Sequence, residues 1–284
     1  MNNSVRILIA ILLLSGIAGA AEREADEVAA TAGAHRGDEP VATPLAEAPP
    51  RAEVVGRDVS YGSVEGVDLH GFLARPAGAG AGTPGLIVIH EWWGLNDNIR
   101  QVARRLAGEG YVALAVDLYD GESASVPKQA IKLMTRLTQN TDLADANLRQ
   151  AYAYLTETVG APRVGSIGWC LGGRWSLRTA LLLPDQLDAT VIYYGTVVTD
   201  EEQLAPLTMP VLGNFAEHDP IIPLKTVDAF TQAMEKLGKD IDVKVYAGAK
   251  HAFSNPSGLA YDPVAAADAW ARTTKFLRSH LAAE

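Results

Sequence analysis

The hydrophobic positions divide the chain into an apolar start, a polar stretch and a long patterned part. The polar stretch, residues 21–50, is rich in Ala, Glu and Pro and contains no aromatic residue. It shows neither the alternating pattern of a strand nor the helical spacing of apolar residues, which predicts a disordered spacer. Regular patterning then runs to the C-terminus. We therefore expect one folded domain over residues 51–284.

The patterned part predicts an α/β fold. Two alternating stretches, 54–61 and 64–74, are joined through Gly62 and indicate an opening hairpin. Beyond it, short apolar runs alternate with helix-patterned segments, which favours a mostly parallel sheet covered by helices on both faces. The predicted strands are 85–90, 111–117, 163–168, 189–194, 211–216 and 241–246, and the predicted helices are 98–108, 127–138, 143–159, 172–183, 224–237 and 264–281. Such sheets bind ligands at the carboxyl ends of their strands.

Composition narrows the choice of partner. The 284 residues are 48% hydrophobic, enough for a core of ordinary density, and they carry a formal net charge of −10. An acidic chain offers no basic surface to nucleic acid or anionic lipid. We expect a monomer that acts on a small molecule.

The first twenty residues predict export. Arg6 precedes an apolar run over residues 7–17, and Ala18, Gly19 and Ala20 form a small-residue cleavage pattern. The alternative is an uncleaved membrane anchor, but the run is well short of the roughly 20 residues that span a bilayer. We expect a signal peptide over residues 1–20, a periplasmic or secreted protein, and no membrane span after cleavage.

The single cysteine lies in a motif typical of nucleophiles. A predicted strand runs into Gly-Trp-Cys-Leu-Gly-Gly, residues 168–173, and a helical pattern follows at once. A nucleophile on a tight strand-to-helix turn has strained backbone angles, and Gly168 and Gly172 remove side chains that would collide there. The helix N-terminus favours a thiolate at Cys170, and the Leu171 N–H would face a developing oxyanion. The alternative is a buried cysteine that acts only as a small hydrophobe.

Candidates for the acid and the base follow the next strands. Asp219 lies on a loop held by Pro220 and Pro223, where a carboxylate could orient an imidazole, and we prefer it to Glu217. A helix cap is the alternative role for Asp219. His251 follows the last predicted strand and is the candidate base; a surface loop histidine is its alternative.

The remaining histidines are weaker candidates. His218 is the rival base, but its neighbour Asp219 is too close in sequence to be its natural partner. His35 lies in the spacer, His70 in the hairpin and His280 near the chain end, and we expect all three to be exposed.

The loop after strand 85–90 holds a second group of candidates. The N–H of Trp92 is a candidate second oxyanion donor. A buried Glu91 would need a partner, and Cys170 is the nearest candidate, so Glu91 either holds the thiol or is an exposed loop residue. Trp93, Tyr119 and Phe253 either line an apolar pocket or are ordinary core aromatics.

Together, His-Glu-Trp-Trp-Gly-Leu-Asn at 90–96, Asp-Leu-Tyr at 117–119, the cysteine motif, the Asp219 loop and His-Ala-Phe at 251–253 resemble the dienelactone hydrolase family. The resemblance implies an α/β-hydrolase fold and a Cys-Asp-His triad that hydrolyses esters or lactones such as carboxymethylenebutenolide. It implies neither a metal nor a cofactor. It also implies that Glu91 hydrogen-bonds the resting thiol until substrate binds.

The chain departs from the family where the substrate carboxylate is held. Gly121 and Asn255 stand where the founding enzymes have arginines. The sequence therefore shows no arginine at these positions to bind the substrate carboxylate through two hydrogen bonds. Two other classes of function remain open. One is a non-catalytic binding protein with an unreactive Cys170, and the other is a redox or peptidase-like thiol enzyme.

Overall fold

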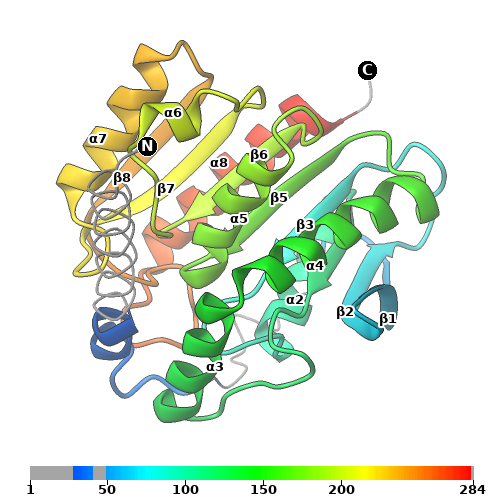
Figure 1. The fold of residues 1–284 in the computed structure, drawn as a ribbon, viewed down its shortest axis with the longest axis horizontal. Helices are drawn as coiled ribbons and strands as arrows, with labels where there is room; N and C mark the ends of the chain where they lie inside the picture. Colours follow the sequence, from blue (N-terminus) through cyan, green and yellow to red (C-terminus); the bar gives the residue numbers. More distant parts are fainter. Residues whose placement is uncertain (1–27, 41–48, 283–284) are drawn as a thin grey trace, which may run out of the picture.

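An eight-stranded sheet forms the centre of the molecule (Figure 1). The computed structural model describes residues 28–40 and 49–282. The strand order is β1-β2-β4-β3-β5-β6-β7-β8; β1 and β2 are antiparallel to their neighbours, and the other pairs are parallel. The strands are β1 (Val54–Val64), β2 (Val67–Pro76), β3 (Gly85–Ile89), β4 (Val112–Val116), β5 (Val164–Trp169), β6 (Ala189–Tyr193), β7 (Val211–His218) and β8 (Ile241–Lys250).

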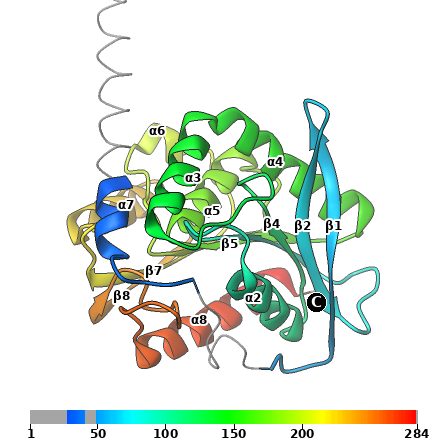
Figure 2. The same ribbon diagram turned by 90° about the horizontal axis from the view of Figure 1, so that it is seen from below.

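Helices cover both faces of this sheet. Figure 2 shows α3, α4 and α5 on one side and α2 and α8 on the other. The helices are α2 (Asp97–Gly108), α3 (Pro127–Gln139), α4 (Thr141–Ala153) with a π-helical turn (Tyr154–Thr158), α5 (Leu171–Leu182), α6 (Glu201–Leu204), α7 (Leu224–Lys236) and α8 (Pro263–Leu281). None of the helices within the described ranges has the length and apolar character needed to cross a membrane.

Because helices cover both faces of the sheet, the central strands are unbroken apolar runs in the sequence. Every residue of β3, β4, β5 and β6 is buried, as expected for parallel strands with helices on both faces. The predicted α/β architecture is confirmed, with element boundaries shifted by a few residues. The sequence missed α6, a single turn too short to show a period.

The opening hairpin is present, but its turn lies elsewhere than predicted. The chain reverses at Glu65 and Gly66, which both have positive φ angles, as the favoured two-residue hairpin turn requires. Gly62 instead lies inside β1, where the pairing register shifts. A glycine in a strand can therefore mark a bulge rather than a turn.

The largest difference from expectation concerns the N-terminal segment, by which we mean residues 28–40. Residues 28–34 are helical, and Thr31, His35 and Asp38 are buried. Asp38 Oδ1 accepts a hydrogen bond of 2.9 Å from the Leu259 N–H, which ties the segment to the loop before α8. The prediction of a disordered spacer over residues 21–50 is therefore wrong for this segment; the predicted signal peptide and residues 41–48 lie outside the described residues.

A physical reason for the missed segment is the polarity of its buried face. Val28, Thr31, Ala32 and His35 follow helical spacing, and the two apolar members pack against the core. Two of the four positions are polar and one is alanine, so the face has little hydrophobic contrast. Its burial depends on hydrogen bonds to distant residues, which a hydropathy pattern does not reveal.

Candidate active site

Cys170 occupies a strained turn between β5 and α5. Its backbone angles are φ 55° and ψ −118°, and it is the residue immediately before the first residue of α5. Positive φ is uncommon for residues other than glycine, and such strain is concentrated at functional sites. Only 5% of Cys170 is exposed. The predicted strand-turn-helix geometry is thus present, with the sulfur near the helix N-terminus.

Two glycines make the turn possible. A Cβ on Gly168 would lie 2.1 Å from the carbonyl oxygen of Gly172, and a Cβ on Gly172 would lie 2.2 Å from that of Ile89. Both contacts are with backbone, which cannot rotate away as a side chain can. The collisions expected from the sequence are therefore real at both positions.

His251 and Asp219 form a buried pair at the same edge of the sheet. His251 Nδ1 lies 2.7 Å from Asp219 Oδ2, and both side chains are almost completely buried. Asp219 Oδ1 accepts hydrogen bonds from the N–H groups of Ile221 and Ile222. Glu217, which the sequence analysis set aside, is instead exposed and accepts from the Gly248 N–H.

Cys170 lies close to two imidazoles rather than one. The sulfur and one ring nitrogen each of His35 and His251 all lie within 4.8 Å of one another. His35 Nε2 is 3.8 Å from Cys170 Sγ. His251 Nε2 is buried and has no hydrogen-bond partner among the described residues. The structure therefore brings the predicted cysteine, histidine and aspartate together and adds a histidine that the sequence analysis expected to be exposed.

Glu91 is buried beside this group. Its Oε2 accepts a 2.7 Å hydrogen bond from Asn255 Nδ2, and its Oε1 has no hydrogen-bond partner among the described residues. Burial and the negative charge of Asp38 raise the pKa of Glu91 to about 8, and the Asn255 bond opposes them only in part. The exposed-loop alternative for Glu91 is wrong, and Asn255, at the place of a family arginine, is its hydrogen-bond donor.

The predicted oxyanion donors occupy suitable elements. Leu171 is the first residue of α5, so its N–H has no carbonyl partner within that helix. Trp92 lies just after β3 and is fully buried, and its carbonyl oxygen accepts a hydrogen bond from Tyr119 Oη. Leu171 at the start of α5 and Trp92 in the loop after β3 therefore both lie at the carboxyl edge of the sheet.

The aromatic residues proposed for a pocket are buried in the core. Trp93, Tyr119 and Phe253 are each exposed by 2% or less. The Phe253 ring packs against Tyr194 and Tyr246, with centroids 5.2 and 4.9 Å away. The structure thus favours the core interpretation, most clearly for Phe253.

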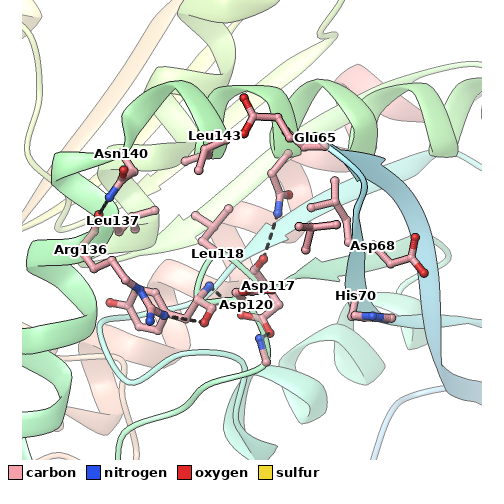
Figure 3. A pocket seen from close by; sticks show the side chains of 17 residues that line it. Glu65, Asp68, His70, Asp117, Leu118, Asp120, Arg136, Leu137, Asn140 and Leu143 are labelled. Carbon is pink, nitrogen blue, oxygen red and sulfur yellow. Dashed lines mark hydrogen bonds between the residues drawn. The ribbon is translucent and has the colours of Figure 1, made fainter.

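A cavity beside Tyr119 is separate from the cysteine. Figure 3 shows this cavity between β2, the loop after β4, α3 and α4; its volume is about 390 Å³. It includes Gly121, whose N–H donates to Asp117 Oδ2, and Arg136, which donates to the Tyr119 carbonyl oxygen. Neither Cys170 nor His251 lines it.

Sequence reasoning missed four residues around the sulfur: His35, Asp38, Tyr194 and Asn255. Tyr194 follows β6 at a positive φ of 35°, and its ring lies 5.2 Å from that of His251. Its place at the carboxyl end of a predicted strand was the only available signal. His35 belonged to the weak helical spacing described above, and apart from the local bond between His35 and Asp38 the printed hydrogen bonds of these two side chains go to distant residues.

The comparisons with known proteins agree with this geometry. A model of the dienelactone hydrolase family matches residues 69–281. "Protein usf" of Aquifex pyrophilus is 38% identical over 223 residues, which cover 76% of this chain and 95% of the relative. A protein of Aquifex aeolicus, provisionally named a carboxymethylenebutenolidase, is 33% identical over 223 residues, with the same two coverages.

A solved structure supports the same assignment. A provisionally named dienelactone hydrolase from Klebsiella pneumoniae superposes with a TM-score of 0.72 at 29% identity, covering 80% of this chain and 100% of that one. The fold, the turn at Cys170 between β5 and α5, and the sequence similarity agree over most of the domain. The match to the family model spans the elements that carry Cys170, Asp219 and His251. The chain belongs to the dienelactone hydrolase family.

Proposed function

We propose that this protein hydrolyses small carboxylic esters or lactones through a Cys170-His251-Asp219 triad. The observation that carries the proposal is the position of Cys170 on a positive-φ turn before α5, within 4.8 Å of a His251 ring nitrogen. His251 is in turn hydrogen-bonded to the buried Asp219. A nucleophile, a base and an orienting carboxylate in this order are the parts that covalent acyl transfer requires.

The proposed first step forms a thioester. Cys170 Sγ attacks the carbonyl carbon and forms a C–S bond, while the thiol proton passes to His251. The tetrahedral intermediate then collapses, the ester C–O bond breaks, and His251 returns the proton to the leaving oxygen. Water attacks the thioester with His251 again as base, which releases the acid and restores the thiol.

Other groups support these steps. The N–H groups of Leu171 and Trp92 are the proposed donors to the oxyanion. Asp219 holds the His251 tautomer and stabilises its cation. The sequence analysis expected Glu91 to hold the resting thiol, but Glu91 Oε2 bonds Asn255 and Oε1 has no hydrogen-bond partner among the described residues. The group beside Cys170 Sγ is His35 Nε2, at 3.8 Å. Because Cys170 is almost completely buried, substrate reaches the sulfur only when a neighbouring group moves.

The substrate is proposed to be uncharged near the reacting carbonyl. Asn255 bonds Glu91 and Ser257 rather than presenting a guanidinium, and Gly121 has no side chain. Without the bidentate grip of an arginine, a carboxylate on the substrate gains little here. Simple esters and neutral lactones fit this site better than dienelactones.

The deciding experiment compares the wild type with Cys170→Ala on a panel of aryl esters and lactones. We expect hydrolysis by the wild type and a mass increase on Cys170 during turnover, both lost in the variant. Turnover that persists in Cys170→Ala would overturn the assignment. A wild type that hydrolyses nothing would favour a binding protein, and preference for peroxide or peptide would favour another thiol enzyme.

A further inference from the structure

The N-terminal segment gives the active-site cysteine a second histidine partner that the family model does not contain. The match to that model begins at residue 69 of this chain, whereas His35 belongs to the segment of residues 28–40. The His35 ring stacks on Trp92 at a centroid distance of 4.9 Å and lies edge-on to His251 at 5.4 Å. Both histidines and Cys170 are buried. Three good ligands for a soft or borderline metal thus meet in one buried place.

Each imidazole is held by a carboxylate on its far nitrogen. Asp38 Oδ2 lies 2.9 Å from His35 Nδ1, and Asp219 Oδ2 lies 2.7 Å from His251 Nδ1. The Nε2 atom of each ring is therefore the one left for another partner. Histidines that bind metals nearly always donate their other N–H to a carboxylate, carbonyl or water, so both rings have the support of a metal ligand.

The spacing suits a tetrahedral ion. A zinc ion with ordinary bonds to one sulfur and one nitrogen separates those atoms by about 3.6 Å. The observed distance from Cys170 Sγ to His35 Nε2 is 3.8 Å. His251 Nε2 is buried without a hydrogen-bond partner among the described residues, so it can take up a ligand bond without breaking another contact.

Charge also favours a cation here. Asp38 and Asp219 each place a carboxylate against one of the two imidazoles. A divalent ion would offset the negative charge and keep the sulfur as a thiolate.

We propose that Cys170, His35 and His251 form a binding site for a divalent transition metal of the zinc type, with the fourth position left for water. Binding displaces the thiol proton and occupies the atoms that the proposed hydrolysis needs. The metal is therefore an inhibitor rather than a cofactor. The inference uses two residues of the proposed triad but does not require that the protein hydrolyse anything.

The test is a titration of the reduced, chelator-treated protein with Co²⁺ in the absence of oxygen. We expect one Co²⁺ per chain, with the intense visible bands of four-coordinate cobalt and a thiolate-to-cobalt charge-transfer band. Zn²⁺ should displace Co²⁺ and remove both signals. Absence of the charge-transfer band, or binding with six-coordinate spectra, would overturn the proposal.

Three variants separate this site from adventitious binding. His35→Ala should weaken Co²⁺ binding by at least about 100-fold, and Asp38→Asn by about 10–100-fold through its effect on His35. His218→Ala, which alters an exposed histidine outside the cluster, should bind like the wild type. Wild-type affinity in both His35→Ala and Asp38→Asn would place the metal elsewhere and reject the site; circular dichroism checks that each variant is folded.

Hydrolysis provides the second readout and separates the two proposals. Zn²⁺ should inhibit wild-type ester hydrolysis, and His35→Ala should need a much higher Zn²⁺ concentration for the same fractional inhibition of its own zinc-free rate. Hydrolysis without Co²⁺ binding would remove only the metal site. Co²⁺ binding without any hydrolysis would remove only the proposed function.

Discussion

At the scale of single residues, the site depends on a small number of buried hydrogen bonds. Asp219 uses one carboxylate oxygen for the N–H groups of Ile221 and Ile222 and the other for His251. The carboxylate cannot turn without breaking bonds worth about 1.5–3 kcal/mol each for a charged group. The His251 ring is therefore fixed in one tautomer and direction before substrate arrives.

This rigidity leads to a prediction for Asp219→Asn. The amide cannot stabilise the imidazolium and allows the wrong tautomer, so we expect kcat to fall by about 10³–10⁴-fold on the best ester substrate. Steady-state kinetics measure the effect. Glu217→Gln is the matched control, because Glu217 lies at the end of β7 two residues before Asp219, is exposed, and contacts only the Gly248 N–H and the exposed His218 among its described partners. Near-normal turnover in Asp219→Asn would remove Asp219 from the mechanism.

Glu91 makes stability depend on pH. Because burial raises its pKa to about 8 in the folded protein, the folded state keeps a proton that the unfolded state loses near pH 4.5. Stability from this group is therefore full below that pH and decreases as the pH rises towards 8, by up to about 1.4 kcal/mol per pH unit.

The corresponding variant is Glu91→Gln, which has no proton to lose. We expect the wild-type Tm to fall between pH 5 and pH 8 by more than the Tm of the variant, with the difference increasing steadily across that range. Thermal melts followed by circular dichroism provide the measurement. Parallel pH profiles for the two proteins would show that Glu91 is already ionised at pH 5.

At the scale of elements, the β5–α5 junction determines where the nucleophile lies. β3 and β5 are neighbours in the sheet, so the start of α5 packs against the end of β3, and Gly172 approaches the carbonyl oxygens of Ile89 and His90. The same approach brings Cys170 beside the loop that carries Glu91 and Trp92. The close contact between Gly172 and the end of β3 thus brings Cys170 together with Glu91 and Trp92, which lie on a separate loop.

Gly168→Ala tests that packing. Its Cβ would meet the Gly172 backbone at 2.1 Å, so we expect a loss of more than about 2 kcal/mol of stability, together with reduced hydrolysis. Urea unfolding measures the first effect and ester kinetics the second. Gly78→Ala is the control, since no atom lies within 4 Å of a Cβ there and φ is not positive. Equal stability of the two variants would contradict the close approach.

At the scale of the whole molecule, the N-terminal segment joins the family domain through its active site. Its buried contacts involve Trp92, Cys170 and Leu259, which come from three distant parts of the chain. Residues 28–40, drawn in dark blue in Figures 1 and 2, lie at the periphery of the molecule, beyond the helices that cover the sheet. Any proteolytic processing of the chain therefore has to leave residues 28–40 in place for the proposed metal site of Cys170, His35 and His251 to form.

The predicted signal peptide is compatible with this requirement. Cleavage after Ala20 would leave a mature chain that starts at Ala21 and keeps the segment. We expect intact-mass measurement of protein from the periplasm of a bacterial host to show this N-terminus, and Ala20→Arg to block cleavage. A mature chain that begins after residue 40 would lack His35, so the exported protein could not form the proposed metal site.

The sequence by itself determined the fold class and the strained turn that holds Cys170. Apolar runs buried on both faces predict a parallel sheet, and a cysteine between two obligatory glycines predicts a strained turn, because both depend on local patterns and local sterics. The position of Asp219 on the loop after β7 followed from the same periodicity. Its bond to His251 was expected because strand ends meet at one edge of the sheet.

Tertiary structure alone decided which polar groups surround the sulfur. His35 and Asp38 come from a segment with little hydrophobic contrast, and Asn255 donates to Glu91 across 164 residues of sequence. Such contacts are made between side chains whose separation along the chain carries no information about their distance in space. A pattern of apolar residues records which positions are buried, but the partners of a buried polar atom are fixed only when the whole chain has packed.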